Sequence, residues 1–364
     1  MGGGQMKRLF YFFVAVFLVF ASKPLWIGAV QESLPSVLDD LRSTVDLVKE
    51  QAKSFSLNLS NQQNQEDNKK YKTPDLKVPH DQLFSIYNIE LGESKAEVER
   101  KMGEPKRISM SEYGVNWETY HDHYHNFFMI AYDKNNKVSG MFTNQNLISS
   151  SIGIKWGSPK ALAEEKLGTP ETYIRKGFVR YQINSKGEYD VFRHGDSVIT
   201  VFYDVHDGNK VTALQVIDDQ LEANNPTFYA KPSAALEKGF EYQLFDLTNA
   251  SRVNHGLPVL KWDGHVAKTA RKHSVDMAQH HYFSHENLQN QTPFDRMKHD
   301  GIAFTVAGEN IAYGQFSSIF AHEGLMNSLG HRENILRKEF RYLGIGVAFN
   351  DESQPFYTED FYNN

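Results

Sequence analysis

The sequence predicts an α+β protein in which two folded domains follow an N-terminal export segment. Three observations predict this organisation: a basic and then apolar N-terminus, a segment that occurs twice in the first half of the chain, and a concentration of histidines in the second half. A chain of 364 residues has room for two domains and a sizeable core. The net charge of −6 gives no reason to expect a nucleic-acid partner. The absence of cysteine excludes disulfides, cysteine nucleophiles and thiolate metal sites.

Residues 1–30 are typical of an export signal. Two basic residues, Lys7 and Arg8, precede an apolar run that ends at Ala21, a small residue at which cleavage could occur. More apolar sequence follows, so residues 9–30 could instead stay uncleaved and span a bilayer as an anchor. Both alternatives predict an extracellular or cell-surface protein, with the membrane as a partner only if the segment is retained.

Residues 31–59 carry apolar side chains at steps of three and four, which predicts an amphipathic helix. This helix could be a coiled-coil stalk, a membrane-surface helix or a packing helix. The polar, apolar-poor residues 60–82 predict a flexible linker.

Residues 83–221 contain an internal repeat. Residues 89–105 align without gaps on residues 154–170, offset by 65 positions. Each copy predicts a strand, a glycine turn and one amphipathic helix that ends at a glycine with proline beyond it. A polar turn between strand-like segments then predicts a hairpin in each copy. We therefore expect one α+β domain built from two tandem repeats, whose glycines and prolines serve turns and helix ends.

Three histidines of this domain stand at alternate positions, His121, His123 and His125. If the segment is a strand, their side chains share one face, and three imidazoles on a face could hold zinc. An exposed strand face needs no metal to explain it, so both interpretations stay open.

A second linker, residues 222–235, contains two prolines and leads to a C-terminal domain, residues 236–364. Periodicity and end signals predict helices over 242–254 and 264–281, and β-branched and aromatic content predicts strands over 342–349 and 355–362. Nine of the fifteen histidines lie between positions 255 and 331. Among them His273, beside the apolar helix face, is predicted to be a hydrogen-bonded core residue.

The stretch HHYFSHEN contains His280, His281 and His285. His281 and His285 have the spacing of a helical metal pair, but the glutamate that the zinc-protease signature requires between them is missing. Downstream, Glu309 lies in GENIAYG, and His331 lies in SLGHRENIL at a predicted helix start with Ser328 as its cap.

Six ordered motifs carry a resemblance to a known family: LTNASR…GLPVLKW, HSVDMAQHHYFSH, GENIAYG, MNSLGHRENIL, YLGIGVAF and FYTEDF. They resemble the CAP superfamily of cysteine-rich secretory, antigen 5 and pathogenesis-related proteins, in its short bacterial SCP-like form. The region upstream resembles the CAP-associated N-terminal domain. The resemblance implies a C-terminal α-β-α sandwich and a central cleft lined by two histidines and two acidic residues.

Carried over by position, the cleft residues are His285, Glu309 and His331. Glu323 is the nearest acid upstream of His331 and the candidate for the fourth. The family commonly has tryptophan where Leu325 stands, so the alignment of Glu323 is open. His280 and His281 are expected to be helix-surface and packing residues.

Two functions from different classes follow. The first is an exported binding module whose cleft takes a lipid, peptide or cell-wall ligand. The alternative is a metal-assisted hydrolase in which His285 and His331 hold zinc and Glu309 is the catalytic general base. Paired histidine and glutamate side chains also form satisfied polar networks that have no catalytic role. No nucleophile elbow favours a covalent mechanism.

Overall fold

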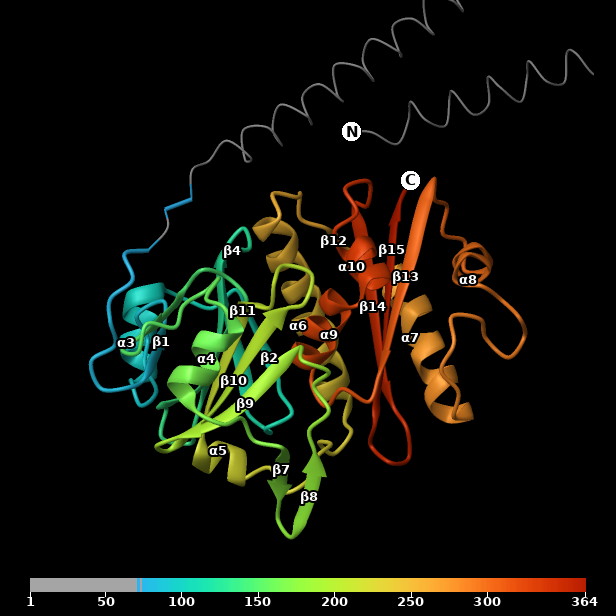
Figure 1. Ribbon diagram of the computed structural model, residues 1–364. Coiled ribbons are helices and arrows are strands. Elements are labelled where there is room, and N and C mark those ends of the chain that lie inside the picture. The colour runs from blue at the N-terminus through green and yellow to red at the C-terminus, as the bar shows by residue number, and fades with distance from the viewer. Residues whose placement is uncertain (1–70, 73) are drawn as a thin grey trace, which may run out of the picture. The chain divides into compact units, whose positions relative to one another are not determined.

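A seven-stranded antiparallel sheet is the centre of the N-terminal domain (Figure 1). Its order is β2-β3-β4-β5-β11-β10-β9. The strands are β2 (Arg107–Met110), β3 (Asn116–Asp122), β4 (His125–Tyr132), β5 (Val138–Thr143), β9 (Tyr189–His194), β10 (Ser197–Asp204) and β11 (Lys210–Asp218). The hairpins β4–β5 and β10–β11 are those predicted from the two repeat copies, and they meet side by side where β5 pairs with β11.

The computed structural model describes residues 71, 72 and 74–364. The predicted export segment 1–30, the predicted helix 31–59 and residues 60–70 of the first linker lie outside the described residues. Within the part that the structure describes, no helix has the length and apolarity needed to cross a bilayer. The described end of the first linker is held in place, because the backbone N–H groups of residues 80–82 all donate to the Glu90 carboxylate.

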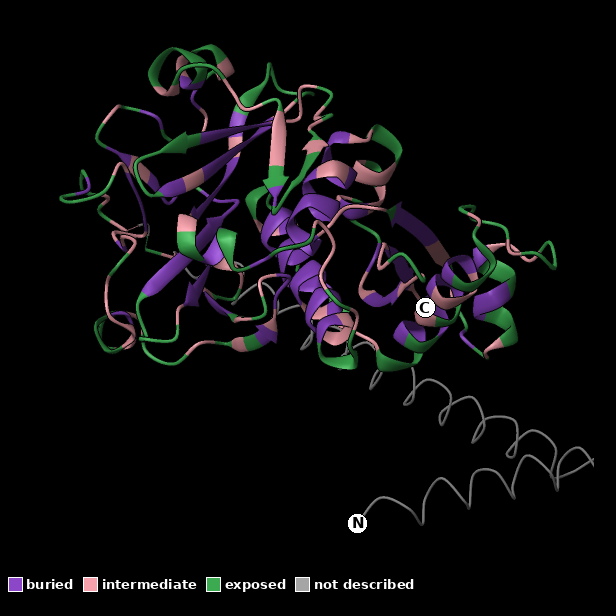
Figure 2. Cartoon of the chain, turned by 90° about the horizontal axis from the view of Figure 1, so that it is seen from below, coloured by how far each residue is buried: buried purple, intermediate pink, exposed green. Residues whose placement is uncertain are grey.

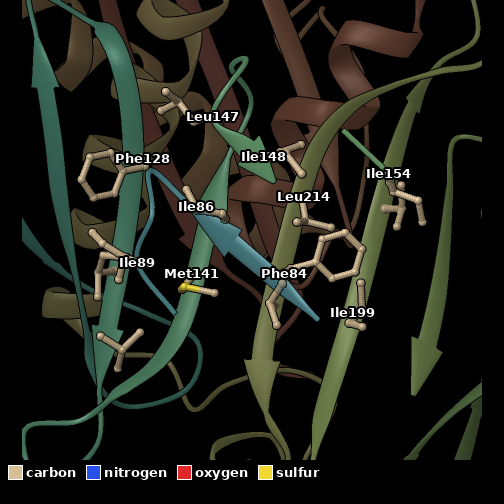
Figure 3. Packing of buried hydrophobic residues seen from close by; sticks show 14 of the residues in the cluster. Phe84, Ile86, Ile89, Phe128, Met141, Leu147, Ile148, Ile154, Ile199 and Leu214 are labelled. Atoms are coloured by element: carbon tan, nitrogen blue, oxygen red, sulfur yellow. The ribbon is translucent and has the colours of Figure 1, made fainter. Parts of the chain in front are cut away.

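Both faces of the seven-stranded sheet are buried. Along β4, Phe128 and Ile130 join a core with β1 (Phe84–Ile86), β6 (Ile148–Ser150) and the helices α3 (Lys95–Met102) and α4 (Lys160–Leu167). Figure 3 shows this core, with β1 lying across the strands of the sheet. The alternate side chains Phe127 and Met129 join a second core on the opposite face. This is the period-two pattern of a strand with two covered faces.

The two repeat copies make equivalent local contacts. Gly92 N–H donates to Val138 O at 2.8 Å in the first copy, and Gly157 N–H donates to Val211 O at 2.8 Å in the second. The two glycines have φ values of 87° and 81°, a backbone region that side chains other than glycine seldom adopt. Each glycine thus turns the chain before α3 or α4 and ties that turn to the strand of its own hairpin.

The C-terminal domain is the α-β-α sandwich implied by the resemblance. Its sheet has the order β12-β14-β15-β13. The strands are β12 (Lys261–Trp262), β13 (Val306–Tyr313), β14 (Tyr342–Phe349) and β15 (Pro355–Asn363). One face of the sheet is covered by three helices, α6 (Ala234–Asn254), α9 (Ser318–Asn327) and α10 (Leu329–Ile335). The other face is covered by α7 (Gly264–His280) and α8 (Pro293–His299). Figure 1 shows α7 and α8 on the outer side of this sheet and α6 on the inner side.

Close approach of α7 to β14 explains two glycines of the YLGIGVAF strand. A Cβ on Gly344 would stand 2.2 Å from Ala267 N, and a Cβ on Gly346 would stand 2.0 Å from Arg271 N. Backbone atoms cannot yield at such distances, so these two positions require glycine. They set how near the helix lies to the sheet.

The helix α6 is shared between the two domains. It is buried along most of its length (Figure 2). Leu247 and Ala250 of α6, with Ile319 and Phe320 of α9, complete the second core of the seven-stranded sheet. The predicted helix start at 242 is corrected to Ala234, because the Ser233 side chain accepts from Leu236 N–H and caps the helix earlier.

Candidate functional site

Glu309 and His285 are in direct contact. Glu309 lies in β13, and His285 lies in the loop after α7, which ends where His281 adopts a left-handed conformation. His285 Nδ1 lies 2.8 Å from Glu309 Oε1, and the exposed fractions of the two side chains are 49% and 1%. A buried carboxylate makes Nδ1 the protonated nitrogen by accepting its hydrogen. Glu309 thereby directs His285 Nε2 away from the carboxylate.

Arg296 of α8 occupies the other oxygen of Glu309. Arg296 Nη2 donates to Glu309 Oε2, and Arg296 Nη1 donates to His285 O at 2.7 Å. Across the strand pair, Asp360 faces Glu309, and burial together with the charge of Glu309 raises the pKa of Asp360 well above its usual value. The carboxylate of Glu309 is therefore buried, paired with a cation and hydrogen-bonded through both of its oxygens.

His331 lies in α10, half-buried. His331 Nδ1 lies 2.8 Å from Ser328 Oγ. Burial lowers the pKa of His331, and the nearby His285 lowers it further, so the two imidazoles are electrostatic neighbours. Ser328 is the N-cap residue of α10, but its side chain makes no capping bond; the hydroxyl contacts His331 instead.

The GENIAYG and GHRENIL motifs are joined by amide side chains. Asn334 Nδ2 donates to Glu309 O at 3.1 Å and to Asn310 Oδ1 at 3.0 Å. Asn310 Nδ2 in turn donates to His331 O at 3.2 Å. A Cβ on Gly308 would stand 2.8 Å from Asn334 Oδ1, so the motif glycine leaves room for this amide. These bonds fix β13 and α10, and with them Glu309 and His331, to each other.

Within the part of the chain that the structure describes, no hydrogen bond or ion pair joins Glu323 to His285, Glu309 or His331. Glu323 lies in α9, 4% exposed, and the charges that act on it are those of Asp204 and Arg332. Burial raises its pKa to about 8. Its Oε1 has no hydrogen-bond partner within residues 74–364. The side chains that contact those of the two histidines and Glu309 include Arg296 and Ser328, which sequence reasoning did not assign to the site.

His273 is a buried histidine, as predicted, with Nε2 2.9 Å from Ser284 O. The bond ties α7 to the loop that carries His285. Burial lowers the pKa of His273.

His121, His123 and His125 do not share a strand face, which corrects the predicted arrangement. β3 ends at Asp122, and His123 and Tyr124 form a turn with φ of 48° and 65°. The His121 ring stacks on Tyr124 at 4.1 Å, and the His125 ring stacks on Tyr71 at 3.7 Å. Across the described ranges, no group of three or more histidine, aspartate or glutamate side chains has the geometry of a metal site.

Comparison with known proteins identifies the class to which the fold and the site belong. Residues 91–228 match the CAP-associated N-terminal family, and residues 245–361 match the cysteine-rich secretory protein (CAP) family. The chain belongs to the CAP family, in its form with a CAP-associated N-terminal domain.

Among its relatives, the chain is 30% identical over 292 residues to YlbC, a membrane protein of Bacillus subtilis, covering 74% of this chain and 82% of YlbC. YkwD of the same organism is 39% identical over 140 residues, 38% of this chain and 52% of YkwD.

Two solved structures resemble nearly the whole described fold. An extracellular SCP-domain protein from Bacillus anthracis has a TM-score of 0.65 at 26% identity, covering 81% of this chain and 100% of that one. A cysteine-rich secretory protein from Staphylococcus aureus has a TM-score of 0.60 at 14% identity, covering 82% and 97%. The second likeness concerns the fold alone.

Proposed function

We propose that the protein is a binding module of the cell envelope that takes an amphipathic ligand, such as a lipid or lipid-linked cell-wall component, beside His285 and His331. The observation that carries the proposal is the burial of Glu309 between two hydrogen-bond donors. A general base must be within reach of the proton that it abstracts, yet the Glu309 side chain is 1% exposed. Both oxygens of Glu309 are already bonded, one to His285 and one to Arg296. The carboxylate is therefore suited to orienting a histidine and poorly suited to hydrolysis.

Exposed apolar side chains adjoin the two histidines in sequence and support an amphipathic ligand. Phe283 precedes His285 by two positions, and Leu329 precedes His331 by two; both side chains are exposed. The Phe283 ring packs against exposed Tyr313 at 5.9 Å. Apolar side chains gathered at an exposed site favour binding of apolar surface. The imidazoles would hold the polar part of the ligand by hydrogen bonds.

Envelope location is supported by the predicted export segment and by the relatives. YlbC is named a membrane protein, and the similar Bacillus anthracis protein is extracellular. With Lys7 and Arg8 of the export segment on the cytoplasmic side, the CAP domain would lie outside the cytoplasm, where lipid and cell-wall ligands are found.

The test is binding of lysophosphatidylglycerol, below its critical micelle concentration, to the full-length chain by isothermal titration. A His285→Ala/His331→Ala variant should lose at least about tenfold in affinity, or about 1.4 kcal/mol. A His280→Ala/His281→Ala variant is the matched control and should bind normally, because these two side chains are exposed at the end of α7. Equal binding by all three proteins would contradict the proposal. Release of fatty acid that stops in Glu309→Gln would favour the hydrolase instead.

A further inference from the structure

A cavity of about 180 Å³ lies between the two domains, apart from the histidine site. One wall is the hairpin of β7 (Tyr173–Lys176) and β8 (Val179–Gln182) with the segment that follows it, and the other is the start of α9 with the loop before it. The lining combines polar side chains with six aromatic rings: Tyr181, Tyr189, Phe202, Phe228, Phe316 and Phe320. Phe228 stacks on Tyr181 at 4.8 Å and contacts Phe316 at 5.1 Å, so the rings form a continuous surface.

Two residues that line the cavity each have a buried oxygen atom without a partner. Glu323 Oε1 and Gln315 Oε1 have almost no accessible surface and accept no hydrogen bond from any residue that the structure describes. A buried acceptor without a donor costs about 1–3 kcal/mol, and native proteins contain few of them. A ligand with hydroxyl or amide donors would recover this free energy once rotation of the two side chains turns these oxygens toward the cavity.

We propose that this cavity binds a saccharide ring, with the apolar face of the ring on the aromatic surface and its hydroxyl groups donating to Glu323 and Gln315. Sugars combine a C–H face with many donors, and that is the combination the lining would satisfy. At roughly 10–15 Å³ per water position, the cavity holds on the order of a dozen waters, comparable with the dozen or so non-hydrogen atoms of a hexose. Gln182 and Asn184 add amide groups to the lining.

The protonation of Glu323 favours a neutral, hydroxylated ligand over a cationic amine. Burial raises the pKa of Glu323 to about 8, so its carboxyl group is largely neutral at pH 7. A neutral carboxyl both donates and accepts, which suits a hydroxyl group, whereas an ammonium ion needs the carboxylate. Lys186 and Glu188 also line the cavity, and their opposite charges offset each other.

A second cavity suggests that more than one sugar unit could be bound. It has a volume of about 230 Å³ and shares Glu323 with the first. Trp156, half-exposed, lines it and offers a further aromatic face. The saccharide ring could belong to a free sugar or to the glycan strand of a cell wall. The experiment below distinguishes these two sources.

The experiment measures binding of N-acetylglucosamine and of lysozyme-released glycan fragments to the full-length chain by ligand-observed NMR. Phe228→Ala removes an aromatic wall and should weaken binding at least about tenfold. Phe178→Ala is the matched control, because Phe178 is fully exposed at the tip of the same β7–β8 hairpin. Tighter binding of fragments than of the monosaccharide would assign the cell-wall strand as the source; equal affinities would assign a free sugar.

A second variant tests whether binding can be lost while the protein stays folded. Glu323→Met removes the unpartnered oxygen, so it should abolish saccharide binding while leaving the melting temperature unchanged or higher. His285→Ala/His331→Ala should bind the sugars normally, which separates this site from the histidine site. The proposal is overturned if the wild-type chain binds neither probe at about 10 mM, or if Phe228→Ala and Glu323→Met bind like Phe178→Ala.

Discussion

At the scale of single residues, the site depends on how Glu309 is neutralised. Its carboxylate is buried between an imidazole and a guanidinium, and both of its oxygens accept a hydrogen bond. Removal of Arg296 would leave the Glu309 charge buried without its cation, and such an unpaired charge costs more than the ion pair itself contributes. Arg296 is therefore as necessary to the position of His285 as Glu309 is.

Arg296→Ala should lower the free energy of unfolding by about 3–5 kcal/mol, because it leaves the Glu309 carboxylate buried without its cation. Lys298→Ala is the control on the same helix, since Lys298 is exposed and its loss should cost less than about 0.5 kcal/mol. Urea unfolding of both variants measures the difference. Similar losses would show that the pair contributes no more than a surface charge.

Zinc should not bind tightly between His285 and His331. Among the residues that the structure describes, no third histidine or carboxylate completes a metal site with these two imidazoles, and the Arg296 guanidinium that pairs with Glu309 opposes a second cation. Zinc titration of wild type, His285→Ala/His331→Ala and His121→Ala/His123→Ala checks this. Stoichiometric binding at micromolar zinc that only the first variant loses would restore the metallo-hydrolase hypothesis.

At the scale of elements, the N-terminal domain holds the end of α9 and the start of α10. Asn327 Nδ2 donates to Tyr203 O at 2.9 Å, and Val205 N–H donates to Asn327 Oδ1 at 3.0 Å. One residue further along α10 than His331, Arg332 pairs with Asp204 at 2.8 Å. The strand β10 thus positions the short segment that carries Ser328 and His331.

Asn327→Ala should change the environment of His331 without touching it. Loss of the amide leaves the Val205 N–H and Tyr203 O groups without their partner, at a cost of about 1–3 kcal/mol each. The His331 imidazole signals in an NMR spectrum should shift, and lysophosphatidylglycerol affinity should fall. Asp207→Asn, in an exposed pair with Lys210, is the control and should leave both unchanged. Unchanged His331 signals in Asn327→Ala would show that the N-terminal domain contacts this segment without positioning His331.

The comparison with the sequence is also clearest at this scale. Elements specified by local signals were predicted well: the two hairpins, and α7, whose predicted range 264–281 differs from the observed end by one residue. His121, His123 and His125 were misplaced, because alternation suggests a strand even where a turn interrupts it. Glu323 is close to His331 in sequence, yet the two lie in different helices, α9 and α10, and closeness in sequence does not show which way the carboxyl group faces. Arg296 gave no local signal, since its role depends on the fold of the loop after α7.

At the scale of the whole molecule, buried ionisable groups set how stability depends on pH. Burial raises the pKa of Glu112 and Glu323 to about 8 and that of Glu359 to about 7. Burial lowers the pKa of His121 to about 4 and that of His322 to about 3. The folded state therefore holds extra protons on the glutamates and lacks protons on the histidines.

The free energy of unfolding should be greatest near about pH 4.5–5. The contribution of the three glutamates is complete below about pH 4.5, where the unfolded carboxyl groups are protonated too, and it is lost as pH rises toward 8. The contribution of the two histidines is complete above about pH 6.5 and is lost as pH falls toward 3. Because three glutamates outweigh two histidines, stability falls from about pH 5 toward 8; below about pH 4 the glutamates no longer respond and the histidine loss makes stability fall again. Melting temperatures across pH 3–9 check both arms. Glu323→Met should flatten the alkaline arm, and a maximum above pH 8 would contradict the prediction.

The position of α6 between two sheets has a consequence for how this protein could be divided. A C-terminal module expressed by itself would expose Leu247, Ala250, Ile319 and Phe320 to water, and an N-terminal module would expose the sheet face that these side chains now cover. Residues 229–244 therefore separate the two family matches in the sequence, but the two domains share one hydrophobic core in the structure. To express the C-terminal domain alone, those four apolar residues should first be substituted with polar ones.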